Sequence, residues 1–554
     1  MKSPLILIFL FFFILSNVKA QNTYRNGVVS SADELASNVG ISILKKGGNA
    51  IDAAVGVAFA LAVVFPQAGN IGGGGFMVLH LKDGTNTSID FREKAPLAAY
   101  RDMFLNENGD VIPNLSLRGH LAAGVPGSVA GLLYALNKYG KLNREDVIEY
   151  AIELAEKGFI LTEELANVLN DYNDELTVFE STRKIFGKEF YAGELFIQKD
   201  LAETLKRIRD FGSDGFYKGE TARLIVNEMK KGNGIITYED LKQYQPVERE
   251  VIKGNYRGYE ILSMGPPSSG GISLIYLLNI LENFNLSKSG HNTAETISIM
   301  TEAMRRVYAD RSEFMGDMDF VNVPVNVLIS KEYAIERMSD FDPMKASESE
   351  IISHGNINDF GSTNTTHFSV ADGEGNVVST TTTINGYFGN KVVVDGAGFF
   401  LNNEMDDFVS KPGVPNMFGL LGNEANAIEP GKRMLSSMTP TIVLKNGRPF
   451  LVTGSPGGGR IITAVMTNIV NIIDFKLSLS DAINSPRFHH QWFPDEIQAE
   501  KNSIAQDVRN KLVKKGYKII DFRDYASIDA ILINDDGSMT GYSDRRGYGK
   551  AIGF

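Results

Sequence analysis

The first part of the chain carries apolar residues at helical spacing. Residues 31–48 hold Ser31 and Glu34 at the spacing of a capping box and end in two lysines and two glycines. These signals together predict one helix. Residues 49–66 are nearly all apolar up to Pro66, the pattern of a helix that is buried on every side.

Two strands are predicted after these helices. Residues 76–82 ("FMVLHLK") and 87–93 ("TSIDFRE") are joined by the turn sequence "DGTN". Because the first run is apolar on both faces, we expect its sheet to be covered on both sides. The glycines of residues 67–75 are expected to allow tight backbone packing. From about residue 113 to 338 the pattern is mostly helical.

After residue 364 the pattern changes to strands joined by short turns. Three hairpins are predicted, with strands at residues 365–371 and 376–385, 440–445 and 448–454, and 528–534 and 539–543. The sequence "GSPGGGR" leads into a further predicted helix at residues 461–474. No repeat or flexible linker accompanies the change. We therefore interpret the chain as one α/β (α+β) fold, with strands from both halves and helices outside, that is cut near residue 364.

Composition narrows the chemistry. The 554 residues are 43% hydrophobic and 22% charged, which is ordinary for a globular protein. The net charge of -12 argues against a nucleic-acid partner. The chain has no cysteine, which excludes disulfides, thiol nucleophiles and cysteine-ligated metals. The seven histidines show no metal-ligand spacing, so no metal or cofactor is predicted. A nucleophile must then be a hydroxyl, an amine or a carboxylate.

The N-terminus resembles a secretory signal. One lysine precedes an apolar run from Pro4 to Leu15, and residues 1–20 end in "VKA", with a cut expected after Ala20. A membrane anchor is the alternative, but the run is shorter than the roughly 20 residues that a span needs. No later stretch is long and apolar enough to span. We expect export, to the periplasm in a two-membrane cell and otherwise into the medium.

The hairpin after residue 364 opens with hydroxyl groups. Counting from its four-residue turn, Ala371 lies opposite Asn376, and Thr365 lies opposite Thr382 and one position from Thr383. Taken alone, the hairpin is best explained as an exposed threonine-rich strand. A chemical alternative is that the bond before Thr365 is cut. The α-amino group released there has a pKa of roughly 7.7–8.0 and can serve as the base for the adjacent hydroxyl.

Several motifs, taken in order along the chain, resemble those of γ-glutamyltransferases. They are "GNAIDAA", "QAGNIGGGGFM", "DFREKAP", "TTHFSV", "LNNEMDDF", "LSSMTPTIV", "TGSPGGGRI" and "FHHQW". The resemblance implies an N-terminal nucleophile hydrolase with a four-layer αββα sandwich. It implies self-cleavage between Asn364 and Thr365 into a large subunit, residues 21–364, and a small subunit, residues 365–554, which share one fold. Such enzymes move the γ-glutamyl group of glutathione and related compounds to water, amino acids or peptides.

The resemblance also assigns roles to individual residues. The catalytic group comprises Thr365 as nucleophile, Thr383 as its assistant, and Gly457 and Gly458 as oxyanion-binding amides. The substrate-binding group comprises Arg92, Ser436 and Ser437 for the α-carboxylate, and Asn385, Glu404 and Asp407 for the α-ammonium.

Each motif has a competing interpretation. Spacing alone favours a salt bridge from Arg92 to Asp90 or Glu93. Residues 401–408 could be a turn of solvated carboxylates or a calcium loop, although the EF-hand pattern is missing. Ser436 and Ser437 could form a strand-entry turn. "GSPGGGR" suggests a phosphate loop but lacks its lysine. A related acylase that cuts glutaryl amides, and a non-enzymatic exported amino-acid-binding protein, remain alternative functions.

Two details concern the surroundings of the site. Residues 410–420 resemble a lid loop of some bacterial members, with Phe418 where certain relatives have tyrosine. Lid closure is therefore expected to depend on packing. His489 and His490 are adjacent in a predicted strand, which makes them poor joint ligands, and we interpret them as structural.

Overall fold

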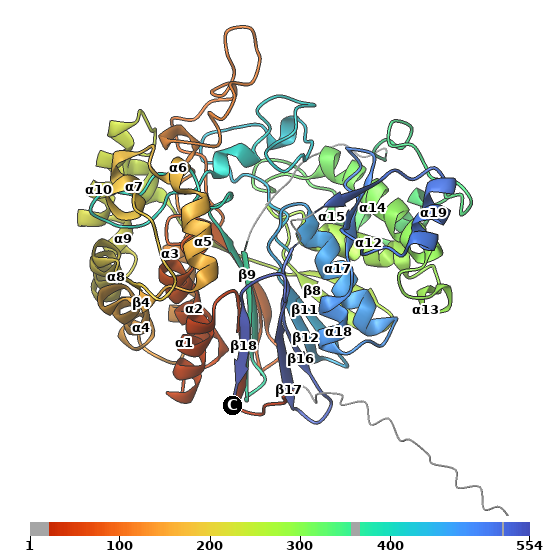
Figure 1. The fold of residues 1–554 in the computed structure, drawn as a ribbon, viewed down its shortest axis with the longest axis horizontal. Coiled ribbons are helices and arrows are strands. Elements are labelled where there is room, and N and C mark those ends of the chain that lie inside the picture. Colours follow the sequence, from red (N-terminus) through yellow and green to blue (C-terminus); the bar gives the residue numbers. More distant parts are fainter. Residues whose placement is uncertain (1–21, 356–365, 523–525) are drawn as a thin grey trace, which may run out of the picture.

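Two β-sheets stand face to face between two layers of helices (Figure 1). The computed structural model describes residues 22–355, 366–522 and 526–554. The four-layer αββα sandwich predicted from the sequence is confirmed.

The first sheet combines strands from both ends of the chain. Its order is β18 (Lys550–Gly553), β1 (Gly27–Ser31), β9 (Thr366–Asp372), β10 (Val377–Thr383), β2 (Gly74–His80), β3 (Asn86–Asp90) and β6 (Val247–Arg249). All its pairings are antiparallel. The hairpin β9–β10 is therefore held between two strands of the first half, so the two halves cannot form separate domains.

The second sheet is also antiparallel. Its order is β17 (Met539–Ser543), β16 (Asp529–Ile533), β12 (Arg448–Gly454), β11 (Thr441–Lys445), β8 (Tyr259–Ser263) and β7 (Ile252–Tyr256). The predicted "NG" hairpin joins β11 to β12, and Asn446 and Gly447 both have the positive φ that such a turn requires. The hairpin β7–β8 lies in the region predicted as mostly helical, and that prediction did not identify it.

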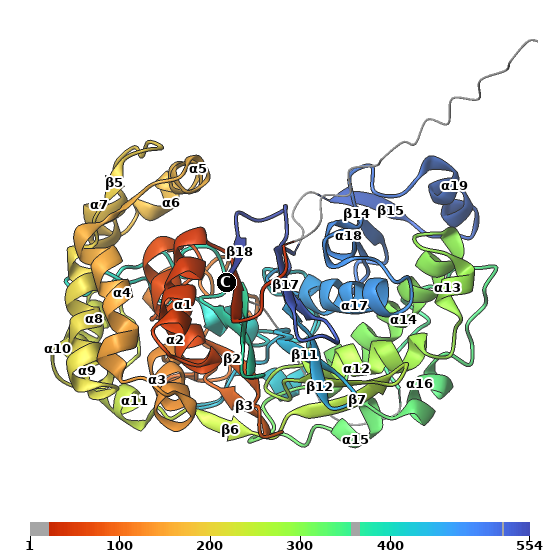
Figure 2. The same cartoon turned by 90° about the horizontal axis from the view of Figure 1, so that it is seen from below.

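Helices of the first half lie on the outer side of the first sheet, with α1, α2 and α3 next to it and the others farther out (Figure 2). They are α1 (Glu34–Lys45), α2 (Ala50–Val64), α3 (Ser128–Tyr139), α4 (Arg144–Lys157), α5 (Glu163–Asp171), α6 (Asn173–Leu176), α7 (Glu180–Phe186), α8 (Lys199–Phe211), α9 (Asp214–Tyr217), α10 (Gly219–Lys231) and α11 (Tyr238–Gln243), with the short pair β4 (Phe159–Ile160) and β5 (Leu195–Phe196). Every residue of α2 is buried, as its sequence predicted.

Helices from the middle and the end of the chain cover the second sheet. They are α12 (Gly270–Leu281), α13 (Leu286–Ser289), α14 (Ala294–Phe314), α15 (Val325–Leu328), α16 (Lys331–Arg337), α17 (Arg460–Ile473), α18 (Leu479–Asn484) and α19 (Gln506–Lys514), beside a small sheet of β13 (Phe488–His489), β14 (Ile497–Glu500) and β15 (Ile519–Phe522). Within the described residues, no helix is long and apolar enough to cross a membrane.

The helix predicted at residues 31–48 forms, but its capping differs from the prediction. Asp33 is the N-cap, and its carboxylate accepts hydrogen bonds from the N–H groups of Leu35 and Ala36. Ser31 belongs instead to β1 and pairs with Phe368 of β9. The prediction of a Ser31–Glu34 capping box was therefore wrong, because Ser31 is part of a β-strand and Asp33 is the N-cap.

The hairpin β9–β10 is paired one residue away from the predicted register. Val377 lies opposite Ala371, and Thr382 lies opposite Thr366. The prediction had placed Asn376 opposite Ala371. Asp372 lengthens β9 because its carboxylate accepts hydrogen bonds from the backbone of the turn, including the N–H of Asn376 at 3.0 Å. Asn364 and Thr365 lie outside the described residues.

The space between the sheets is apolar toward one end and polar near the start of β9. Ser369 donates to the backbone oxygen of Asp529 at 3.0 Å, and Ser379 donates to that of Thr453 at 3.1 Å. The Asp529 carboxyl accepts a hydrogen bond from Ser30 at 2.9 Å, and burial raises its pKa to about 7. Polar side chains thus connect the two sheets behind the predicted active site.

Candidate active site

A buried guanidinium lies just beyond the end of β3. Arg92 Nη1 is 2.7 Å from Glu404 Oε2, and Arg92 Nη2 is 2.6 Å from Asp407 Oδ2. Both carboxylates come from one short 3₁₀ helix, η2 (Glu404–Asp407), and all three side chains are fully buried. The structure therefore brings together three of the predicted substrate-binding residues from distant parts of the chain.

The local alternatives for Arg92 contribute less. Glu93 lies 3.6 Å from the guanidinium. Asp90 accepts from the backbone N–H of Arg92 at 2.9 Å, while its carboxylate pairs with Arg249 and Arg433. Sequence neighbours thus supply one longer contact, and η2 supplies the two short ones.

This cluster holds three carboxyl groups, those of Glu93, Glu404 and Asp407, around one guanidinium. Burial raises the pKa of Glu93 to about 8 and the pKa of Glu404 well above its ordinary value. The surrounding carboxylates keep Arg92 charged by raising its pKa. Glu404 Oε1 and both carboxylate oxygens of Glu93 accept no hydrogen bond from another described residue. A second cation bound here would lower these pKa values, because a nearby positive charge favours the ionised form of a carboxyl group.

The predicted serine pair lies in the segment before β11. Ser437 Oγ accepts a hydrogen bond from Arg311 Nη2 at 2.7 Å. Ser436 Oγ accepts from the N–H of Met438 at 3.1 Å. The adjacent backbone oxygen of Met434 accepts from Arg92 Nε at 3.1 Å. These contacts place the serine segment beside the Arg92 cluster.

The end of β10 reaches the same cluster. Thr383 Oγ1 accepts from the backbone N–H of Asn385 at 2.7 Å. Asn385 has a φ of 69°, and its amide nitrogen donates to the backbone oxygen of Asn403, the residue before η2, at 3.0 Å. An added Cβ on Gly73 would lie 1.9 Å from the backbone oxygen of Thr383. The expected tight packing of the glycine stretch is confirmed here.

The loop after β12 presents backbone amides. Gly457 and Gly458 have φ angles of 122° and 67°, which favour glycine. An added Cβ on Gly457 would lie 2.8 Å from the Cβ of Ala526. Neither glycine N–H donates a hydrogen bond to any described residue. Both amides are therefore available to bind a negatively charged oxygen, and α17 follows directly, as predicted.

Residues of the predicted lid, 410–420, are hydrogen-bonded to the site. The N–H of Met417 donates to Asp406 Oδ2 at 3.1 Å, and Asn416 Nδ2 donates to Asp407 Oδ1 at 3.3 Å. Phe418 packs against the core around α12, α14 and α17. The expectation that closure depends on packing was therefore incomplete, because carboxylates of η2 also hold the loop.

The adjacent histidines belong to separate hydrogen-bond networks. His489 Nδ1 contacts Thr463 Oγ1 at 3.0 Å, whereas His490 Nε2 contacts Asp495 Oδ1 at 3.2 Å. Both rings are buried. These contacts support their interpretation as structural residues.

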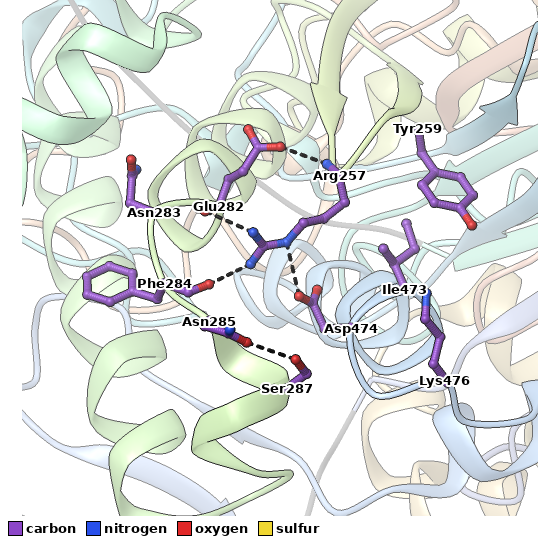
Figure 3. Close-up of a pocket in the computed structure, with 10 residues that line it drawn as sticks. All are labelled: Arg257, Tyr259, Glu282, Asn283, Phe284, Asn285, Ser287, Ile473, Asp474 and Lys476. Atoms are coloured by element: carbon purple, nitrogen blue, oxygen red, sulfur yellow. Dashed lines mark hydrogen bonds and ion pairs between the residues drawn. The ribbon is translucent and has the colours of Figure 1, made fainter.

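A surface pocket of about 500 Å³ lies elsewhere, at the C-terminal end of α12 (Figure 3). Arg257 donates there to the backbone oxygens of Glu282 and Phe284 and pairs with Asp474. A guanidinium in this position caps the helix end. We therefore interpret the residues of this pocket as holding the end of α12 in place, and assign the pocket no catalytic role.

Sequence reasoning missed Arg311. It lies on α14, is 1% exposed and donates a hydrogen bond to Ser437 of the predicted serine pair. The available signal was a group of three arginines, Arg305, Arg306 and Arg311, in a helix that is otherwise mostly buried.

The fold is that of the class of N-terminal nucleophile hydrolases, in which two stacked antiparallel sheets lie between outer layers of helices. We call the loop between β12 and α17, residues 455–459, the glycine loop. The γ-glutamyltranspeptidase family model matches residues 36–554, and the chain belongs to this family. Its members are enzymes, so the sequence-based predictions of family and of enzyme activity are confirmed.

The similar proteins agree with this assignment. A glutathione hydrolase proenzyme of Escherichia coli (strain K12) is 49% identical, over 94% of this chain and 90% of that protein. A γ-glutamyltranspeptidase structure from Helicobacter pylori is 50% identical, with a TM-score of 0.58, over 59% of this chain and 94% of the other. A cephalosporin acylase structure from Bacillus halodurans has a TM-score of 0.86 at 27% identity, over 99% of both chains.

Proposed function

We propose that this protein is a self-cleaving γ-glutamyltransferase and glutathione hydrolase with Thr365 as its nucleophile. The observation that carries the proposal is the buried cluster of Arg92, Glu404 and Asp407 beside Ser436 and Ser437. Its charges complement the amino-acid end of a γ-glutamyl group, which carries one carboxylate and one ammonium.

Cleavage would use the position of Thr365 in the chain. Thr366 is the first residue of β9 and pairs with Thr382, the residue before Thr383, and Thr365 is the residue that precedes Thr366 in the sequence. Thr383 Oγ1 already accepts a hydrogen bond from the N–H of Asn385, which leaves its O–H to donate. This hydroxyl is suited to orient the Thr365 hydroxyl for attack on the Asn364 carbonyl. The Asn364–Thr365 C–N bond would break as an ester forms, the freed α-amino group would take up the hydroxyl proton, and water would then hydrolyse the ester.

Transfer would follow in two steps. The Thr365 hydroxyl attacks the γ-amide carbonyl, and its own α-amino group accepts the proton. The N–H groups of Gly457 and Gly458 stabilise the oxyanion. The amine leaves with a proton, a γ-glutamyl ester remains on Thr365, and water or an acceptor amine attacks this ester. The acceptors would be amino acids or peptides.

The buried cluster of Arg92, Glu404 and Asp407 would bind the α-carboxylate and α-ammonium of the donor. Arg92 binds the α-carboxylate together with Ser436 and Ser437. The α-ammonium replaces part of the guanidinium contact with Glu404 and Asp407, and Asn385 lies beside it. An incoming ammonium would favour the ionised form of the carboxyl groups whose pKa values burial raises.

The precursor would divide into residues 21–364 and 365–554. β9 and β10 of the small part pair with β1 and β2 of the large part, so the two would stay associated after cleavage. Residues 1–20, which lie outside the described part of the chain, would be a signal peptide. Export would place the enzyme in the periplasm or, in a one-membrane cell, in the medium.

The test combines intact mass with activity. We expect wild-type protein to give two species, the smaller beginning at Thr365, and to release p-nitroaniline from γ-glutamyl-p-nitroanilide. Thr365→Ala should remain one chain and be inactive. A wild-type protein that stays uncut under folding conditions, or an active Thr365→Ala variant, would refute the proposal.

Cleavage of a glutaryl amide, the acylase alternative, is supported by the similarity to the cephalosporin acylase structure. A glutaryl group has no ammonium to satisfy Glu404 and Asp407. We therefore expect γ-glutamyl-p-nitroanilide to be preferred over glutaryl-p-nitroanilide, and the opposite preference would favour the acylase.

A further inference from the structure

Arg311 is a buried cation whose hydrogen-bond partners are hydroxyl groups. Its Nη2 donates to Ser437 Oγ at 2.7 Å and its Nε donates to Ser269 Oγ at 3.1 Å. Among the described residues, no carboxylate lies within ion-pair distance of it. Burial lowers its pKa to about 10, which still leaves it charged at neutral pH.

Neighbouring arginines on the same helix are paired differently. Arg306 Nη1 lies 2.6 Å from Glu302, and Arg305 lies 3.4 Å from the same carboxylate. A buried charge without a counter-ion is costly to the fold. Arg311 differs from these neighbours, because the carboxylate of Asp407 acts on it only from beyond ion-pair distance. Its charge is therefore only partly compensated within the described residues, which favours binding of an added anion nearby.

The bond to Ser437 determines what that hydroxyl can do. A guanidinium can only donate, so Ser437 Oγ must use a lone pair to receive it. The Ser437 hydroxyl hydrogen is then directed to another acceptor. A carboxylate is an acceptor of the matching kind, and the positive charge of Arg311 behind the serine strengthens such a bond.

We propose that Arg311 is a positioning residue for the α-carboxylate of the γ-glutamyl donor, acting through Ser437. This inference rests on the proposed function. It adds a second guanidinium, besides that of Arg92, to the recognition of one carboxylate. Arg92 contacts the segment at Met434 and Arg311 contacts it at Ser437.

The same helix also reaches the glycine loop. The Tyr308 hydroxyl donates to the backbone oxygen of Gly459, and the Arg311 guanidinium lies 5.8 Å from the centre of the Tyr308 ring. Tyr308 and Arg311 are one helical turn apart on one face. A substitution of Arg311 that leaves Tyr308 in place should therefore affect KM more than kcat.

Two donor substrates distinguish a loss of carboxylate binding from a general disruption of the enzyme's structure. γ-Glutamyl-p-nitroanilide has the α-carboxylate, whereas 4-aminobutyryl-p-nitroanilide keeps the amine and lacks the carboxylate. A charge-assisted hydrogen bond contributes about 10- to 100-fold in affinity. We expect Arg311→Gln to lower kcat/KM by about that factor for the first donor, mainly through KM, and to change the second by less than about threefold. Arg311→Lys should recover part of the loss.

Equal losses for the two donors would overturn the proposal, since a structural role predicts them. A double-mutant cycle adds a second criterion: in a Ser437→Ala background, Arg311→Gln should cost much less, and full additivity would count against it. Arg306→Gln is the matched control on α14 and should leave the ratio of the two donors unchanged.

Intact mass distinguishes the two levels of failure. Each variant should still give two species, because self-cleavage does not use the donor carboxylate. If wild type is uncut or inactive on γ-glutamyl-p-nitroanilide, both the proposed function and this inference fail. If wild type is active and the ratio of kcat/KM for the two donors is the same in wild type and Arg311→Gln, only this inference fails. Should Arg311→Gln not fold, the ratio measured for Arg311→Lys decides.

Discussion

A single methyl group added at Gly454 should disturb both stability and self-cleavage. Gly454 ends β12, three residues before Gly457, and its backbone touches the ring of His367. An added Cβ would lie 2.3 Å from both Cε1 and Nδ1 of that ring. The ring is fully buried and is held by Thr381 at Nδ1 and by Ser369 at Nε2, each at 3.0 Å. It has little freedom to move away.

The magnitude follows from two opposing effects. Overpacking of a tight interior costs about 1–3 kcal/mol, and the fixed ring points to the upper end. Replacing glycine with alanine also stiffens the unfolded chain, which stabilises by about 0.4–1 kcal/mol. We expect Gly454→Ala to lower the free energy of unfolding by about 2 kcal/mol. The amides of Gly457 and Gly458 would also stabilise the oxyanion formed when Thr365 attacks the Asn364 carbonyl, so a shift of this loop by about 1 Å should slow self-cleavage by about 100-fold.

Denaturant unfolding and the time course of precursor cleavage measure the two effects. Gly541→Ala is the control, because its Cβ would lie 2.6 Å from Val28 in the same space between the sheets but away from the start of β9. It should lose stability and keep its cleavage rate. Adding His367→Ala to Gly454→Ala should restore part of both quantities. A Gly454→Ala protein within about 0.5 kcal/mol of wild type, with normal cleavage, would refute the reasoning.

Three further outcomes are expected. Arg92→Gln should lower the free energy of unfolding by about 3–5 kcal/mol near pH 8, because buried carboxylates lose their cation. It should also raise KM for the donor so far that the rate no longer saturates. A stable variant with a normal KM would contradict the assignment. The pKa of Glu93 is raised to about 8 in the folded state, so the folded state binds more protons than the unfolded state between about pH 4.5 and pH 8. The free energy of unfolding should therefore fall as pH rises through this range. Glu93→Gln should reduce the slope, which denaturant unfolding at several pH values measures. Asp406→Ala should speed hydrogen exchange of the Met417 amide by about tenfold or more, and unchanged exchange would show that packing alone holds the loop.

The candidate site could be predicted only in part. Motif resemblance selected Arg92, Glu404 and Asp407, and the structure brings their side chains together. Arg311 was missed because a single arginine in a helix resembles its ion-paired neighbours, and only its hydroxyl partners distinguish it. The roles of Thr365, Gly457 and Gly458 stay predictions.

The sequence by itself determined the local elements. The apolar run of α2, the "NG" turn between β11 and β12 and the strands β2 and β3 follow from patterns of a few neighbouring residues. Only the tertiary structure decided which strands pair and how the charges are shared. The register of β9 with β10 depends on the carboxylate of Asp372. The pKa of Glu404 depends on its burial and on Arg92, which lies far away in the sequence. Such contacts depend on burial and on chain closure over long distances, which no short sequence window contains.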